Sequence, residues 1–166
     1  TIQSHSHCKL YKKNLWDNVR YPIDIVAMED QATIYKTFIR SNSVFICDYA
    51  GYHYVQDGES ICRSPMSNKK VLDSIKGYLT SVQDPDLPKE CYNYAIQGFA
   101  NCYLMMYPRY KNEKNNEEFI KIKKIFNSNK MINKFHPKNI KETLKKIAYL
   151  FFRPFFSFLY KVLRCI

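Results

Sequence analysis

Apolar residues at helical spacing limit this chain's fold more than any other feature of its sequence. After Pro65 they recur every three or four positions in three successive stretches, which predicts three amphipathic helices. The three sets are Val71, Leu72, Ile75, Leu79 and Val82; Tyr92, Ile96, Phe99 and Tyr103; and Phe119, Ile122, Ile125 and Phe126. The region that follows Pro65 is therefore expected to be helical.

The first 64 residues have a mixed pattern. Residues 28–41 have apolar side chains at helical spacing, with Glu29 and Asp30 in the expected first turn. Residues 43–47 form a continuous apolar run that is typical of a buried strand, and residues 49–56 predict a second extended segment. Helix and strands in this order predict an α/β arrangement for this part of the chain.

The charge of the chain is concentrated in its last third. The net charge is +11, and the residues from Lys111 onward contribute +10 through 14 basic and 4 acidic side chains. A basic segment of this kind favours a polyanionic partner. With only four glycines and no C-x-x-C pair, the chain has neither a glycine-rich phosphate loop nor a common zinc motif.

The C-terminal segment, residues 140–166, alternates Phe and Leu with Lys and Arg. Its apolar runs are shorter than the ~20 residues of a membrane span, so it predicts an amphipathic helix that lies on an anionic membrane surface. Alternatives are a terminal helix docked on the protein's own core and a true span. The residues expected at the membrane are Lys145, Lys146, Phe151, Phe152, Arg153, Phe155, Phe156, Lys161 and Arg164.

Several short motifs occur in a fixed order over roughly residues 7–64. They are Lys9-Leu10-Tyr11-Lys12-Lys13, Tyr21-Pro22, Glu29-Asp30, the apolar run 43–47, Tyr52-His53-Tyr54 and Ser60-Ile61. Together they resemble the C-terminal half of the catalytic domain of bacterial family 2 glycosyltransferases. The resemblance implies a partial GT-A (nucleotide-diphospho-sugar transferase-like) half-domain at residues 1–64, a helical extension at 65–110 and a basic helical tail at 111–166.

The same resemblance implies an inverting, nucleotide-sugar-dependent transferase of the hexosyltransferase type, acting on a surface-polysaccharide or lipid-linked acceptor. Asp30 matches the family's catalytic base, and Glu29 would bind the acceptor or support Asp30. A base is needed because a sugar hydroxyl is a poor nucleophile until a carboxylate accepts its proton. Without the surrounding motifs, two acids here would indicate only a helix N-terminus.

The family's loop over the donor diphosphate matches His53, Tyr54, Gln56 and Ser60. Two positions depart from the family pattern, because Val55 replaces the usual Arg and Glu59 replaces the usual Gly. His53 is the one candidate metal ligand that the resemblance suggests; otherwise it is an exposed loop histidine.

The family binds Mn²⁺ or Mg²⁺ and the nucleotide through an Asp-x-Asp motif in its N-terminal half, and no such motif precedes Asp30. We therefore expect a truncated chain that binds no cofactor itself and is inactive alone. In the full enzyme the partners would be a nucleotide sugar and a glycan or lipid-linked acceptor. The enzyme would lie in the cytoplasm, at the inner face of the plasma membrane. No nucleic-acid partner is expected. The alternative is a non-catalytic basic module that binds membranes or nucleic acid.

Overall fold

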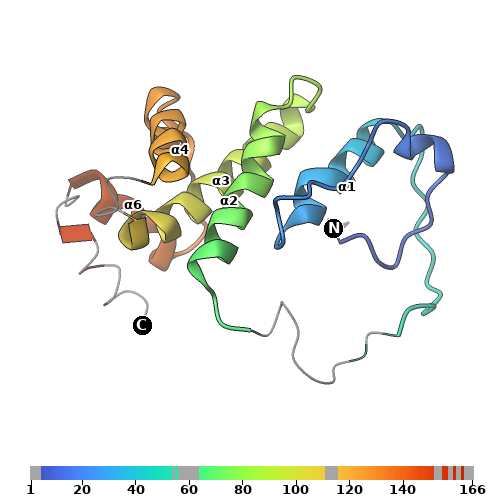
Figure 1. The fold of residues 1–166 in the computed structure, drawn as a ribbon, viewed down its shortest axis with the longest axis horizontal. Helices are drawn as coiled ribbons and strands as arrows, with labels where there is room; N and C mark the ends of the chain where they lie inside the picture. Colours follow the sequence, from blue (N-terminus) through green and yellow to red (C-terminus); the bar gives the residue numbers. More distant parts are fainter. Residues whose placement is uncertain are drawn as a thin grey trace. The chain divides into compact units, whose positions relative to one another are not determined.

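The computed structural model describes residues 5–53, 55, 64–110, 116–151, 155, 156, 159 and 162. All regular structure in these residues is helical (Figure 1). The chain divides into two units, Thr1–Lys89 and Glu90–Ile166. The elements are η1 (Lys13–Trp16), α1 (Glu29–Ile39), α2 (Asn68–Gln83), α3 (Lys89–Tyr110), α4 (Glu117–Ser128), α5 (Met131–Lys134) and α6 (Ile140–Phe151).

The predicted α/β arrangement, and with it the partial GT-A half-domain, is wrong. None of the described residues lies in a strand, and residues 43–47 follow α1 as an irregular, exposed segment (Figure 1). The Phe45 side chain is 93% exposed. A strand needs a neighbouring strand to pair its backbone N–H and C=O groups, and none is present among the described residues. The apolar run alone therefore does not produce a sheet.

The N-terminal unit is built on the packing of α1 against α2. Val19, Ile25, Ile34, Val71 and Ile75 are buried in its core. Two hydrogen bonds tie the helices together. The Ser81 hydroxyl donates to the Gln31 carbonyl at 3.4 Å, and the Tyr35 hydroxyl donates to the Asp84 carboxylate at 2.5 Å. The helices expected at residues 28–41 and after Pro65 are thus present as α1 and α2.

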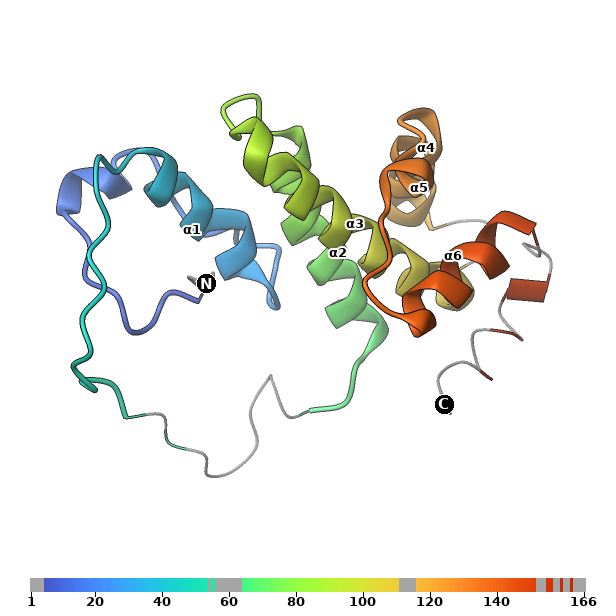
Figure 2. The same cartoon turned by 180° about the vertical axis from the view of Figure 1, so that it is seen from behind.

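The C-terminal unit contains α3, α4 and α6 (Figure 2). Aromatic side chains from these helices hold the unit together. Tyr103 of α3 stacks on Phe126 of α4 with their ring centroids 3.8 Å apart, and Tyr149 of α6 meets Tyr103 edge-on at 5.9 Å. All three side chains are buried, as is Phe99. Such pairs add stability beyond the area they bury, so the helical stripes predicted for this region form its core.

Candidate functional site

The Glu29-Asp30 pair begins α1, as the sequence predicts. Both side chains are half-buried in the first turn of the helix, where negative charge is favoured by the helix dipole. The residue before them, Met28, adopts a left-handed conformation with φ of 69°. The chain therefore turns sharply immediately before the two carboxylates.

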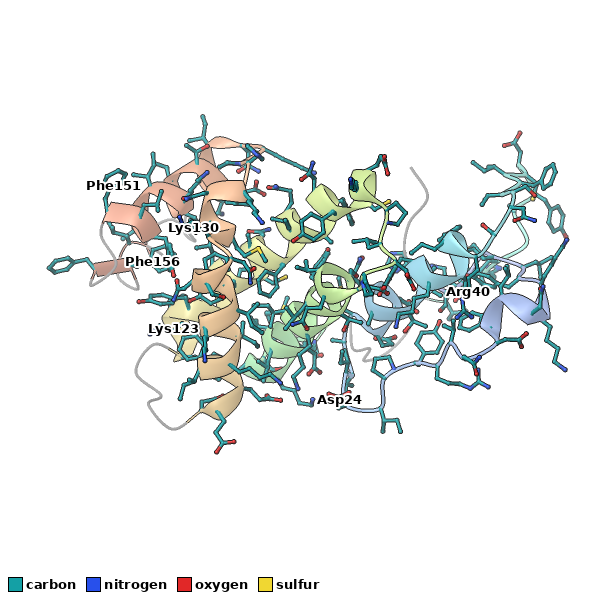
Figure 3. All side chains as sticks on the ribbon, turned by 90° about the horizontal axis from the view of Figure 1, so that it is seen from above. Asp24, Arg40, Lys123, Lys130, Phe151 and Phe156 are labelled. Atoms are coloured by element: carbon teal, nitrogen blue, oxygen red, sulfur yellow. The ribbon has the colours of Figure 1, made fainter. Side chains whose placement is uncertain are left out.

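Side chains of α2 hold the segment that leads into this turn. The Asp73 carboxylate, which is 1% exposed, accepts a hydrogen bond from the Val26 amide at 3.0 Å and pairs with Lys69 at 3.1 Å. An exposed ion pair between Lys76 and Asp24 (3.8 Å; Asp24 is labelled in Figure 3) adds a weaker link. The Asp73 contact is the stronger constraint on this segment, because its carboxylate is buried and pairs with a part-buried backbone donor.

A glycine on α2 allows the turn at Met28 to approach closely. A Cβ atom built on Gly77 would lie 2.7 Å from the Met28 carbonyl oxygen, closer than real Cβ atoms come. Asp73, Gly77 and Ser81 are spaced four residues apart and lie on one face of α2. Each of them meets the chain at or just before the start of α1, through Val26, Met28 and Gln31 respectively.

Three aromatic side chains cluster before α1: Tyr11 and Tyr21 come from the two motifs there, and Trp16 lies between them in the sequence. Tyr11 meets Trp16 edge-on with ring centroids 5.3 Å apart, and Trp16 lies 5.8 Å from Tyr21. Arg40, labelled in Figure 3 and situated just after α1, donates a hydrogen bond to the Asp17 carbonyl that follows η1. The aromatic cluster is thereby linked to α1.

The negative charge of Asp30 raises the pKa of both tyrosines in this cluster. Burial raises the pKa of Tyr21 above its ordinary value; the charge of Asp30 and a hydrogen bond to its carboxylate raise that pKa further, while a hydrogen bond to Ser6 lowers it. The pKa of Tyr11 is raised by burial first, then by Tyr21 and Asp30. The charge of Asp30 therefore affects side chains from two other motifs that are separate from it in the sequence.

The Tyr11 hydroxyl is buried and has no hydrogen-bond partner among the described residues. A buried polar group without a partner costs free energy, and in native proteins most such groups are satisfied by protein, water or a ligand. The charge of Asp30 also reaches this hydroxyl, whose pKa is raised first by burial.

The predicted donor-diphosphate loop is described only in part. His53 lies exposed in an irregular stretch, whereas Tyr54, Gln56 and Ser60 lie outside the described residues. The preceding Tyr52 stacks on His7 at 4.9 Å, and His7 stacks on His5 at the same distance. These stacked rings place the segment that contains His5 and His7 beside the start of the loop.

The described residues do not fit a metal site. They contain no group of three or more His, Cys, Asp or Glu side chains that could hold an ion. His53 in particular has no set of described ligands around it, so we derive no chemical step through a metal.

The residues expected at a membrane divide into three groups. Phe151 and Phe155 are exposed, and Lys145 and Lys146 are half-buried on α6. Phe156 is instead fully buried against Tyr107 and Tyr149, with both centroid distances 5.7 Å, so it cannot contact lipid in this arrangement. Phe152, Arg153, Lys161 and Arg164 lie outside the described residues.

Burial and charge also affect the lysines of α6. Burial lowers the pKa of Lys145, and the neighbouring charge of Lys141 lowers it further against the opposing effect of Glu142. The Lys146 ammonium donates a hydrogen bond to the Phe135 carbonyl at 2.6 Å. None of the helices in the described part of the chain is long and apolar enough to cross a bilayer.

Sequence reasoning missed the residues that hold the carboxylate pair in place. Asp73, Gly77 and Ser81 carry a readable signal, because small or polar residues at positions i, i+4 and i+8 of an otherwise amphipathic helix indicate close packing on a second face. The convergence of Tyr11 and Tyr21 on Asp30 has no such signal, since it depends on the irregular path of residues 5–28.

Comparison of the chain with protein-family models, with curated proteins and with solved structures finds no match.

Proposed function

We propose that the N-terminal unit carries the acceptor side of an inverting, nucleotide-sugar-dependent glycosyltransferase, with Asp30 as the general base. The observation that carries this proposal is the half-buried Asp30 carboxylate in the first turn of α1, with a charge that raises the pKa of Tyr11 and Tyr21. Each of these residues belongs to a different motif of the glycosyltransferase resemblance. The proposal concerns the site alone and does not require the α/β fold that the structure contradicts.

The chemistry needs one carboxylate in reach of a sugar hydroxyl. In the proposed step the acceptor oxygen forms a bond to the anomeric carbon of the donor sugar. The bond from that carbon to the diphosphate oxygen breaks, and the nucleoside diphosphate leaves with the bonding electrons. The hydroxyl proton passes to a carboxylate oxygen of Asp30.

The neighbouring side chains have supporting roles in this proposal. Tyr21 lies near enough to Asp30 for the carboxylate charge to raise its pKa, and it would help to position the base. The half-buried aromatic face of Trp16 would pack against the sugar ring. Glu29, half-buried beside Asp30, would bind the acceptor.

The test is sugar transfer by membranes of cells that express the protein carrying this sequence. A panel of radiolabelled nucleotide hexoses serves as donors, and the membranes supply lipid-linked acceptors. The variant Asp30→Asn keeps the shape of the side chain but removes the base, so we expect transfer to fall by at least about 100-fold. The matched control is Asp24→Asn, which changes an exposed carboxylate, and this variant should transfer sugar at the wild-type rate.

Thermal unfolding separates loss of chemistry from loss of fold. Asp30→Asn should unfold within a few degrees of the wild type, because Asp30 is not part of the Asp73 contact that holds the turn. If Asp30→Asn retains the wild-type rate of transfer, or if no nucleotide hexose is transferred by the wild type, the proposal is wrong.

A further inference from the structure

Helix α6 exposes an apolar stripe on the side that faces away from the core. Ile140 is 79% exposed, Leu144 40%, Ile147 43% and Phe151 75%. At ~100° per residue, these four positions fall within an arc of about 60° on the helix surface. They therefore form one continuous ridge, which we call the α6 stripe.

The α6 stripe is not needed to hold the helix on the protein. Tyr149 lies nearly opposite the stripe and is fully buried, edge-on to both Tyr103 and Tyr107. The helix start is also satisfied locally, because Asn139 accepts from the Glu142 amide and Glu142 accepts from the Lys138 amide. The helix is thus apolar on two sides, and only one of them serves the fold.

The segment that carries the stripe is positively charged. Residues 131–151 contain five lysines and one glutamate, a net charge of +4. Lys141 is exposed next to the stripe, and Lys123 and Lys130 of the same unit are also exposed (labelled in Figure 3). An apolar ridge with lysines beside it matches a surface that combines anionic groups with an accessible apolar layer.

We propose that the α6 stripe docks the protein on an anionic lipid bilayer, with α6 parallel to the membrane plane. Ile140, Leu144, Ile147 and Phe151 would enter the boundary between headgroups and acyl chains, and the exposed Lys141 would contact lipid phosphates. The stripe is a ridge on the outer side of a helix, so it suits a fluid surface that needs no complementary groove. This docking is independent of the glycosyl-transfer proposal.

A second copy of the chain is a poorer occupant of the same surface. Pairing two α6 stripes would bring two segments of net charge +4 together, and like charges across an interface oppose association. An anionic bilayer instead attracts each lysine near its surface. Charge complementarity therefore selects the bilayer.

The experiment is co-sedimentation of the full chain with vesicles of phosphatidylcholine containing about 30 mol % phosphatidylserine, compared with vesicles of phosphatidylcholine alone. We expect the wild type to bind the anionic vesicles, and added salt to weaken the binding. The double variant Ile147→Glu/Phe151→Glu should reduce the partition coefficient by about tenfold or more, because it places charge in the apolar layer. The matched control, Ile120→Glu, changes an exposed apolar residue of α4 and should bind like the wild type.

A second measurement does not depend on a charged substitution. The variant Phe151→Trp should shift its fluorescence emission to shorter wavelength when anionic vesicles are added, as the indole enters the apolar layer. Circular dichroism should show that every variant keeps the wild-type helix content, since all the changed side chains are exposed.

Three results would overturn the proposal. In the first, the wild type fails to bind the anionic vesicles. In the second, the double variant binds as well as the wild type. In the third, the wild type is a dimer by light scattering and the double variant a monomer, which would assign the stripe to a second copy of the chain.

Discussion

Replacement of Asp73 by alanine is expected to lower the free energy of unfolding of the N-terminal unit by about 2–3 kcal/mol. The Asp73 carboxylate is buried, and it accepts the Val26 amide hydrogen bond at 3.0 Å. Alanine leaves that part-buried donor without its partner. Lys69 adds little to the loss, because its side chain is mostly exposed and returns to water when the pair is removed.

Chemical denaturation and hydrogen exchange measure this effect. The Val26 amide should exchange faster in Asp73→Ala than in the wild type, even under conditions where the unit stays folded. The control is Asp73→Asn, whose side-chain oxygen can still accept from Val26, so it should lose less stability than the alanine variant. An alanine variant with wild-type stability and an equally protected Val26 amide would show that this contact does not hold the turn before Asp30.

Replacement of Phe126 by alanine is expected to destabilise the C-terminal unit by about 3–5 kcal/mol, the usual range for a phenylalanine removed from a core. Phe126 is buried, stacks on Tyr103 at 3.8 Å and lies 6.0 Å from Phe99. Its loss leaves a cavity between α3 and α4 and removes the stacked face of Tyr103. The whole aromatic core therefore loses a central contact.

Thermal and urea unfolding monitored by circular dichroism measure this loss. The matched control is Ile120→Ala on the same helix, where the side chain is exposed and the change should stay within about 0.5 kcal/mol. If Phe126→Ala and Ile120→Ala cost the same, the aromatic cluster is not the core of this unit.

The helices were predictable because their apolar residues are local and periodic. The stripe from Val71 to Val82 predicts α2 without knowledge of its partner, and Phe119 to Phe126 do the same for α4. The prediction failed at residues 43–47, because a strand depends on pairing with a distant segment and local composition does not report it. The same apolar run lies exposed and irregular after α1.

The candidate site was predictable only in part, for a related physical reason. The position of Glu29 and Asp30 in the first turn of a helix could be predicted from the sequence. Tyr21 gains its place in the cluster from its ring contact with Trp16, and Asp73 gains its role from the Val26 amide, which is 47 residues away. Contacts of this kind depend on tertiary packing, so the sequence pattern alone does not place them.

The account rests on the Asp30 carboxylate lying near enough to Tyr21 for its charge to raise the pKa of the tyrosine, and the ionisation of Tyr21 tests that interaction directly. Burial and the negative charge of Asp30 both raise the pKa of Tyr21 above its ordinary value of 10.0. Removal of the charge in Asp30→Asn should therefore lower this pKa, although burial keeps it raised. The measurement is an NMR titration of the Tyr21 ring carbons in both proteins: a lower midpoint in Asp30→Asn is the predicted result, and identical midpoints would contradict the account.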